Sequence, residues 1–373
     1  MTVGVAILGS TGSIGCSTLQ VLARQRERFR VAALTAHSNA DLLERQAAEW
    51  QPTYVGLVNS GNGEKGKGKG PACLVEAATR PDVQIVVNGI VGAAGLEATL
   101  AALAAGKRVA LANKETLVMA GELVTRTARD GGGEIVPVDS EHSAVLQCIT
   151  GRRSGELARL ILTASGGPFR TWNPERVAAA TVEEALRHPT WKMGKKITVD
   201  SATLVNKALE VIEAHFLFAV PYAAVDVVVH PQSVVHAFVE FVDGSVLAQV
   251  GFPTMELPIL YALTHPHRVP DAGPRRFDPV AAGTLTFEPL VKERYPAYGL
   301  GRAAAAAGGT APTVFNAANE VAVELFLEGR IPFGRIAETI ERVLAAHCAS
   351  DAGSLAAVLE ADADARRLAR EAA

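Results

Sequence analysis

Six short apolar runs alternate with helix-like segments in the first third of the chain, and this rhythm constrains the fold more than any other feature. The runs cover residues 3–8, 30–35, 53–58, 83–88, 108–111 and 134–137. Apolar character that is continuous, not alternating, indicates strands buried on both faces. We therefore expect an α/β fold whose N-terminal part is a Rossmann-like, doubly wound parallel sheet.

The rhythm stops after Asp139. Residues 158–163 are typical of a strand, 200–218 of one helix, and 224–251 of strands with a hairpin turn at Asp243-Gly244. These patterns predict a central α+β catalytic domain. A Pro- and Arg-rich connection follows from residue 271, and helical spacing resumes after residue 311. We expect a nucleotide domain at 1–138, a catalytic domain at 139–270 with a closing loop at 187–195, a connecting segment at 271–310, and a helical domain at 311–373.

Composition excludes several classes of function. The formal net charge of -3 provides no basic field for nucleic acid. The four cysteines are widely spaced and suit a reducing compartment. No apolar stretch reaches the roughly 20 residues of a membrane span, and the N-terminus lacks a leader pattern. We expect a cytoplasmic protein with neither nucleic acid nor a membrane as partner. The Gly- and Lys-rich insert at 59–70 is typical of a flexible loop.

A glycine-rich turn at residues 9–15, G-S-T-G-S-I-G, stands where the first strand should give way to a helix. Glycines allow close approach of a pyrophosphate, and a helix N-terminus offers it amide donors. A tight structural turn is the alternative. At the end of the second strand, His37, Ser38 and Asn39 occupy the place where NAD-selective sites carry an acidic residue. This predicts NADPH, although Ser38 or Asn39 could simply cap the next helix.

Two acidic residues follow the last strand of the predicted sheet. Asp139 and Glu141 are separated by one residue, and carboxylates at the carboxyl end of a strand can bind one hard cation such as Mg²⁺ or Mn²⁺. Neighbouring His142 alone does not indicate zinc, because no second histidine lies at a suitable local spacing. Solvated loop residues are the alternative interpretation.

The predicted helix at 200–218 has a polar stripe in an apolar context. Asn206, Glu210 and Glu213 share a face, with Lys207 beside them. Together with Ser201, Asn206 and Lys207 suit a phosphate monoester, and Glu210 could supply a third oxygen to the metal. An ordinary amphipathic surface helix is the alternative.

Three short motifs complete the pattern: S-G-G-P-F at 165–169, H-P-T-W-K-M-G at 188–194 and H-P-Q-S-V-V-H at 230–236. The first could cradle a phosphate or form a plain turn. The second predicts a loop with bulky apolar side chains that closes over substrate and excludes water. The third lies on or near a strand, where a structural histidine is the default.

Four further segments belong to the same series: A-N-K-E at 112–115, P-V-D-S-E-H-S-A at 137–144, V-D-S-A-T at 199–203 and N-A-A-N-E-V-A-V at 316–323. The whole series resembles the motifs of the 1-deoxy-D-xylulose 5-phosphate reductoisomerase family, in order from residue 9 to residue 323. The resemblance implies NADPH-dependent rearrangement and reduction of 1-deoxy-D-xylulose 5-phosphate to 2-C-methyl-D-erythritol 4-phosphate, in non-mevalonate isoprenoid synthesis. It also implies a homodimer and a divalent metal: Mg²⁺, Mn²⁺ or Co²⁺.

The resemblance assigns roles to individual residues. The implied NADPH contacts are Thr11, Gly12, Ser13, Ile14, His37, Ser38, Asn39, Asn113, Glu115 and Gly194. The implied metal ligands are Asp139, Glu141 and Glu210. The implied substrate contacts are Lys114, Ser140, Glu141, Ser165, His188, Met193, Ser201, Asn206, Lys207, Glu210 and His236. The implied catalytic set is Lys114, Asp139, Glu141, His188, Trp191 and Glu210.

Two positions depart from the pattern of many relatives. His37-Ser38 replaces a glycine followed by a basic residue, and Thr254 and Glu256 replace Asp and Arg, where we expect an effect on packing or an interface only. Two rival functions fit parts of the sequence: an NADP-linked, metal-dependent dehydrogenase that does not rearrange its substrate, and a non-catalytic NADP(H) sensor.

Overall fold

The computed structural model describes residues 2–59, 68–191 and 193–373. Contacts divide the chain into two compact units. The first contains Met1–Thr116, Val124–Leu146 and Thr254–Arg276, and the second contains Leu117–Leu123, Gln147–Pro253 and Phe277–Ala373. Most of the predicted insert, at 60–67, and Lys192 of the predicted closing loop lie outside the described residues.

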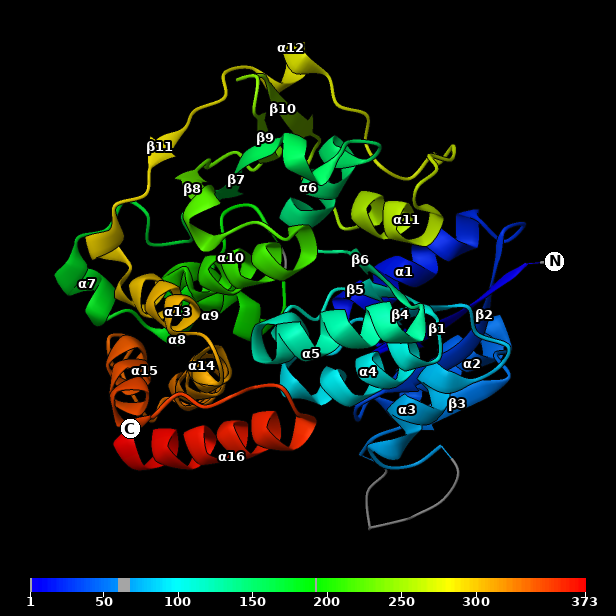
Figure 1. The fold of residues 1–373 in the computed structure, drawn as a ribbon, viewed down its shortest axis with the longest axis horizontal. Helices are drawn as coiled ribbons and strands as arrows, with labels where there is room; N and C mark the ends of the chain where they lie inside the picture. The colour runs from blue at the N-terminus through cyan, green and yellow to red at the C-terminus, as the bar shows by residue number, and fades with distance from the viewer. Residues whose placement is uncertain (1, 60–67, 192) are drawn as a thin grey trace. The chain divides into compact units, whose positions relative to one another are not determined.

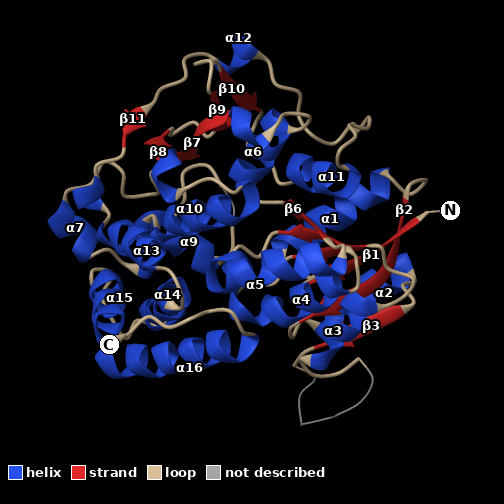
Figure 2. Cartoon of the chain, in the orientation of Figure 1, coloured by secondary structure: helices blue, strands red, loops and turns tan. Residues whose placement is uncertain are grey.

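The first unit is built on a parallel six-stranded sheet (Figures 1 and 2). Its strands, in the order β3-β2-β1-β4-β5-β6, are β1 (Val3–Leu8), β2 (Phe29–Ala36), β3 (Tyr54–Leu57), β4 (Ile85–Asn88), β5 (Arg108–Leu111) and β6 (Glu134–Pro137). All five pairings are parallel. The predicted doubly wound sheet is confirmed, because this order reverses direction between β1 and β4.

Helices pack on both faces of this sheet. They are α1 (Ser13–Arg24), α2 (Ala40–Trp50), α3 (Ala72–Thr79), η1 (Gly92–Gly95), α4 (Leu96–Ala104) and α11 (Glu256–Thr264). Figure 1 shows α1 beside α11 on one face and α3 beside α4 on the other. Ile259 and Leu263 of α11 belong to the same buried core as Val5 and Ile7 of β1. Residues 254–276 therefore pack with the N-terminal sheet, a division that differs from the predicted boundary at 270.

Two helices pass from one unit to the other along the chain. They are α5 (Glu115–Gly131), whose residues 117–123 belong to the second unit, and α6 (Ser140–Ile149). The first of these helices is interrupted at Ala120, where φ is -141° and ψ is 35°.

The second unit contains a mixed five-stranded sheet in the order β10-β9-β7-β8-β11. Its strands are β7 (Leu157–Ala164), β8 (Val225–Val229), β9 (Val235–Phe241), β10 (Val246–Val250) and β11 (Glu288–Pro289). β7 pairs with β8 in parallel, whereas the other pairings are antiparallel. The predicted hairpin joins β9 to β10, and Gly244 at its turn has φ +82°.

Helices make up the rest of the second unit: η2 (Ser154–Glu156), α7 (Pro174–Ala178), α8 (Val182–Ala185), α9 (Lys195–Thr203), α10 (Val205–Phe218), η3 (Tyr222–Ala224), α12 (Pro279–Ala282), η4 (Lys292–Arg294), α13 (Pro296–Ala307), α14 (Ala311–Leu327), α15 (Arg335–Ala346) and α16 (Leu355–Ala372). The predicted helical segment at 311–373 contains α14, α15 and α16. The predicted connecting segment at 271–310 contains β11 and α13, so part of it is regular structure. Across the described residues, no helix has both the length and the apolar character that a membrane span requires.

One prediction for this unit is wrong. The single helix expected at 200–218 is two helices, because Leu204 adopts the left-handed conformation with φ +54° and ends α9. Ser201 therefore lies on α9, whereas Asn206, Lys207 and Glu210 lie on α10. Residues 207–214 of α10 are all buried, which excludes the amphipathic surface helix.

Candidate functional site

The glycine-rich turn joins β1 to α1 at the carboxyl edge of the parallel sheet. Gly9 has φ +82°, and a Cβ on Gly15 would lie 2.4 Å from the Gly9 carbonyl oxygen, so the turn itself needs glycine at both positions. Gly12 differs, because its φ is -80° and the nearest described atom to a Cβ would be the Gly9 oxygen, at 3.4 Å. Gly12 and Ser13 are exposed at the start of α1. This arrangement fits a pyrophosphate approaching the helix N-terminus.

His37, Ser38 and Asn39 directly follow β2, and all three are exposed. The Asn39 side-chain oxygen accepts the Leu42 amide at 3.2 Å, so the predicted helix cap is confirmed at Asn39. The His37 ring and the Ser38 hydroxyl are donors at the place where doubly wound folds bind the adenosine ribose. Capping and nucleotide binding are therefore compatible in this segment.

Asn113 and Lys114 lie between β5 and α5, Glu115 begins α5, and all three residues are nearly fully buried. Asn113 Nδ2 donates to two backbone carbonyls, at 2.8 and 2.9 Å, and to a Glu115 carboxylate oxygen at 3.2 Å. The Lys114 ammonium forms an ion pair with the Asp139 carboxylate, beyond the end of neighbouring β6. The two adjacent strands thus bring Lys114 and Asp139 together at the carboxyl edge of the sheet.

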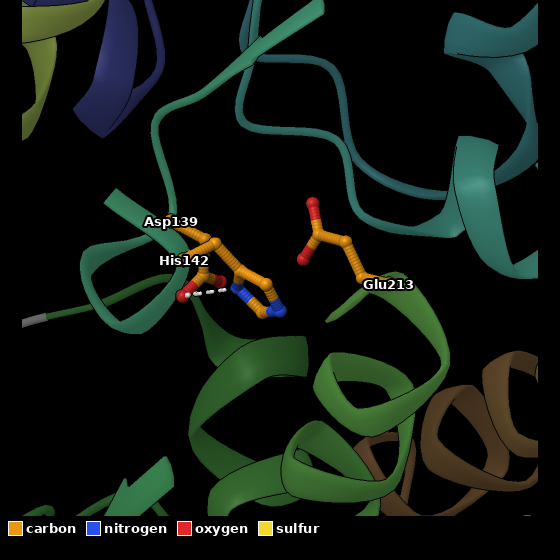
Figure 3. Close-up of side chains that lie close together, drawn as sticks. All are labelled: Asp139, His142 and Glu213. Carbon is orange, nitrogen blue, oxygen red and sulfur yellow. Dashed lines mark ion pairs between the residues drawn. The ribbon is translucent and has the colours of Figure 1, made fainter. Parts of the chain in front are cut away.

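Asp139 is largely buried, with 10% of its side chain exposed. Burial alone would raise its pKa, but the Lys114 ammonium and the His142 ring hold the pKa of Asp139 well below its usual range. Figure 3 shows the His142 ring pointing toward Asp139, and its Nδ1 lies 3.5 Å from Asp139 Oδ1. In the same segment, the Ser140 hydroxyl donates to the Glu141 carboxylate. Two neighbouring carboxylates at the end of a strand are the donor type that hard divalent cations select.

In the second unit, the predicted phosphate motif at 165–167 contacts α9. Ser165 follows β7, and Gly166 and Gly167 have φ +82° and +68°. A Cβ on Gly167 would lie only 2.7 Å from the Ser201 carbonyl oxygen. Glycine is therefore needed here for backbone conformation and for close approach. Motif interpretation missed this contact, although two consecutive glycines after a strand were a signal for it.

Lys207 connects the same turn to α10. Its buried ammonium donates to the Thr163 carbonyl at 2.5 Å, two residues before Ser165, and forms an ion pair with Glu210. The Asn206 amide donates to the other Glu210 oxygen. The end of β7, α9 and the start of α10 thus gather hydroxyl, amide and ammonium groups, the set predicted to bind a phosphate.

His188 is joined to Ser165 by a hydrogen bond of 2.9 Å between Nε2 and Oγ. Burial lowers the pKa of His188 to about 4, so the ring is neutral at physiological pH. Its Nδ1 accepts the backbone amides of Thr190 and Trp191, at 3.1 and 2.9 Å, which assigns the proton to Nε2. Ser165 Oγ therefore accepts from Nε2 and from the Gly167 amide, and its own proton can be donated to an anion.

The described part of the predicted closing loop is irregular, as expected, and ends at Gly194, the N-cap of α9. The Trp191 and His236 rings lie 6.3 Å apart between centroids. His230 Nδ1 donates to the Thr286 carbonyl at 2.8 Å, and its Nε2 accepts the Val234 amide at 3.1 Å. These two hydrogen bonds confirm the structural interpretation of that histidine.

The predicted residues are divided between the two units. The glycine-rich turn, residues 37–39, residues 113–115 and the acidic pair belong to the first unit. The phosphate set, the loop residues, His236 and Glu210 belong to the second.

Family models match three segments of the chain. They are 1-deoxy-D-xylulose 5-phosphate reductoisomerase at residues 5–121, its C-terminal domain at 135–218, and the DXP reductoisomerase C-terminal domain at 250–368. A 1-deoxy-D-xylulose 5-phosphate reductoisomerase of Citrifermentans bemidjiense is 51% identical, covering 98% of each chain. One of Halalkalibacterium halodurans is 46% identical over 97% of each.

Solved structures of the same enzyme match the whole fold. A DOX-P reductoisomerase in complex with NADPH, fosmidomycin and magnesium has a TM-score of 0.94 at 40% identity, covering 99% of this chain and 98% of that one. The Zymomonas mobilis enzyme in complex with NADPH has a TM-score of 0.91 at 40% identity, covering 100% and 99%. The chain therefore belongs to the 1-deoxy-D-xylulose 5-phosphate reductoisomerase family.

Proposed function

We propose that this protein converts 1-deoxy-D-xylulose 5-phosphate to 2-C-methyl-D-erythritol 4-phosphate in non-mevalonate isoprenoid synthesis, using NADPH and a divalent metal. The observation that carries the proposal is sequence identity: about half of the residues are identical, over nearly the full length of the chain, in relatives named for this enzyme. The phosphate set of the second unit and the acidic pair of the first supply the two kinds of group that this substrate requires.

We propose Asp139, Glu141 and Glu210 as the ligands of the metal, Mg²⁺ or Mn²⁺ with Co²⁺ as a further candidate. Three carboxylates suit a hard cation, and the low pKa of Asp139 keeps that ligand ionised. When bound, the cation would polarise the substrate carbonyl and favour ionisation of the adjacent hydroxyl.

The proposed NADPH contacts are Thr11, Gly12, Ser13, Ile14, His37, Ser38, Asn39, Asn113, Glu115 and Gly194. NADPH would supply the hydride for the rearranged aldehyde. The exposed residues after β2 contain donors and no carboxylate, so a 2′-phosphate meets no like charge there. A clear preference for NADPH over NADH follows from this arrangement.

The chain's own residues bind, orient and enclose the substrate. Ser165, Ser201, Asn206 and Lys207 would hold its phosphate, and the neutral His188 orients the Ser165 hydroxyl toward it. Lys114 would steady negative charge that develops at the reacting oxygens. The other proposed substrate contacts are Ser140, Glu141, Glu210, Met193 and His236. Closure of the loop at 187–195 with Trp191 would exclude water from the intermediate.

We further propose a cytoplasmic homodimer and the functional division into domains at 1–138, 139–270, 271–310 and 311–373. Support for a dimer comes from β10, an edge strand of the second sheet that exposes Val246 and Leu247 by 49% and 40%. An apolar edge of this kind favours pairing with another strand. Light scattering should give twice the chain mass, and Leu247→Glu should shift the population toward monomer.

Product analysis tests the proposed reaction against its rivals. Carbon-13 NMR of the product should show the branched skeleton of 2-C-methyl-D-erythritol 4-phosphate. A straight-chain polyol phosphate would identify a dehydrogenase that does not rearrange its substrate. NADPH binding with no product, in a folded sample supplied with metal, would favour a sensor.

A further inference from the structure

The motif at 316–323 on α14 contributes no residue to the proposed site, yet two of its side chains are fully buried asparagines, Asn316 and Asn319. Asn319 Nδ2 donates to Asp200 Oδ1 at 2.8 Å. The other Asp200 oxygen pairs with the Lys196 ammonium at 3.0 Å. Asp200 is only 1% exposed. All of these residues belong to the second unit, where α14 packs against α9.

A buried carboxylate is unfavourable unless its oxygens are paired. Asp200 meets this requirement through partners on two elements, the amide of Asn319 on α14 and the ammonium of Lys196 in the first turn of α9. A hydrogen bond fixes direction as well as distance, whereas an apolar contact tolerates sliding. The Asn319–Asp200 bond therefore fixes the rotation of α9 about its axis relative to α14.

The rotation of α9 decides where Ser201 points, because Ser201 is the next residue along the helix. A side-chain oxygen about 4 Å from the helix axis moves by more than about 1 Å when the helix turns by about 20°. Displacement of a substrate contact by about 1 Å can reduce catalytic efficiency by about a hundredfold. The Ser201 backbone also lies close to Gly167, because a Cβ on Gly167 would be 2.7 Å from the Ser201 carbonyl oxygen. A rotation of α9 would therefore also affect the turn at 165–167.

We propose that Asn319 and Asp200 are positioning residues of the phosphate subsite: through α9 they aim the Ser201 hydroxyl at the sugar phosphate without touching it. Lys196 ties the same carboxylate to the start of α9, directly after the closing loop. The inference rests on the proposed function to the extent that Ser201 is a phosphate contact.

Asn319→Leu tests the proposal, with Asn316→Leu as the matched control. Both asparagines are fully buried on the same helix, but Asn316 Nδ2 donates to Glu320 at 2.9 Å and not to α9. The holoenzyme with NADPH and Mg²⁺ is assayed for KM and kcat with the sugar phosphate. Calorimetry gives the Kd for inorganic phosphate, and fluorescence gives the Kd for NADPH.

We expect Asn319→Leu to raise the KM and the phosphate Kd by about tenfold, with a smaller change in kcat and an unchanged NADPH Kd. Asn316→Leu should leave the KM and the phosphate Kd at wild-type values. Equal effects of the two variants on these constants, or no effect of Asn319→Leu, would overturn the proposal. If the wild-type protein shows no turnover but the two variants still differ in phosphate affinity, the proposed function is contradicted and the inference stands.

Asp200→Asn and Asp200→Leu provide a second comparison if Asn319→Leu does not fold. Asp200→Asn retains an oxygen that can accept from Asn319, whereas Asp200→Leu does not. Phosphate affinity near the wild-type value in Asp200→Asn, with a loss in Asp200→Leu, supports positioning through this hydrogen bond. Loss of phosphate affinity in both variants would assign the effect to the buried charge and reject the role of Asn319.

Discussion

Lys207 and Glu210 form a buried ion pair whose energetic coupling can be measured directly. Their side chains are only 3% and 1% exposed, and the Lys207 ammonium also donates to the Thr163 carbonyl at 2.5 Å. Removing one partner of a buried pair leaves an uncompensated charge, which typically destabilises a protein by about 3 to 5 kcal/mol. Because Thr163 still accepts from Lys207, we expect the lower end, about 3 kcal/mol, for Glu210→Gln.

Lys207→Met should be similarly destabilising, because it removes the ammonium that compensates the buried charge of the Glu210 carboxylate. The double variant, Lys207→Met with Glu210→Gln, removes both charges. Its loss should therefore be smaller than the sum of the single losses by about 2 kcal/mol or more.

Urea unfolding in the presence of chelator measures these free energies without a contribution from bound metal. Glu183→Gln is the control, because Glu183 of α8 and Arg187, just beyond the end of that helix, form an ion pair with side chains 78% and 70% exposed. This control should leave the unfolding free energy unchanged. Additive single losses, or a loss below about 1 kcal/mol for Lys207→Met, would refute the assignment of a strongly coupled buried pair.

Three further predictions use other features of the site. Burial lowers the pKa of His188 from 6.5 to about 4. As the pH drops through this interval the unfolded chain binds a proton at His188 before the folded protein does, so the free energy of unfolding falls. In urea unfolding, His188→Gln should lose less stability than the wild type over the same interval. Gly167→Ala should weaken the binding of inorganic phosphate, measured by calorimetry, by tenfold or more. Gly244→Ala is the control, because Gly244 has a similar positive φ and no described atom lies within 4 Å of an added Cβ. This variant should leave the phosphate affinity unchanged. Gly12→Ala should weaken NADPH binding in a fluorescence titration without lowering stability, whereas Gly15→Ala should lower both because its Cβ collides with the turn.

The sequence predicted the six strands of the first sheet because their apolar runs are largely continuous. β1, β2 and β4 are buried almost throughout, whereas the edge strand β3 exposes Val55. The break between α9 and α10 could not be predicted in this way, because Leu204 adopts φ +54° without the glycine or proline that usually signals a helix end. Leu204 is buried in the hydrophobic core of the second unit, so tertiary packing can stabilise this conformation. β11 could not be predicted either, because a strand of two residues paired with β8 leaves no periodic pattern in the sequence.

For the site, motifs identified the chemical groups but not what orients them. Ser165, Ser201 and Lys207 were predicted from residue type and from resemblance. The close approach of Gly167 to Ser201 and the bond from Lys207 to the Thr163 carbonyl depend on contacts between distant segments. The contact between Asn319 and Asp200 spans 119 residues of sequence, and no local pattern reveals it.

The most direct test of the proposed function is NADPH oxidation, followed by absorbance, on addition of 1-deoxy-D-xylulose 5-phosphate. We expect oxidation with Mg²⁺ or Mn²⁺, its loss with chelator, and its absence in Glu210→Gln shown to be folded under the assay conditions. Absence of oxidation by folded wild-type protein with either metal, or full activity in the presence of chelator, would contradict the account.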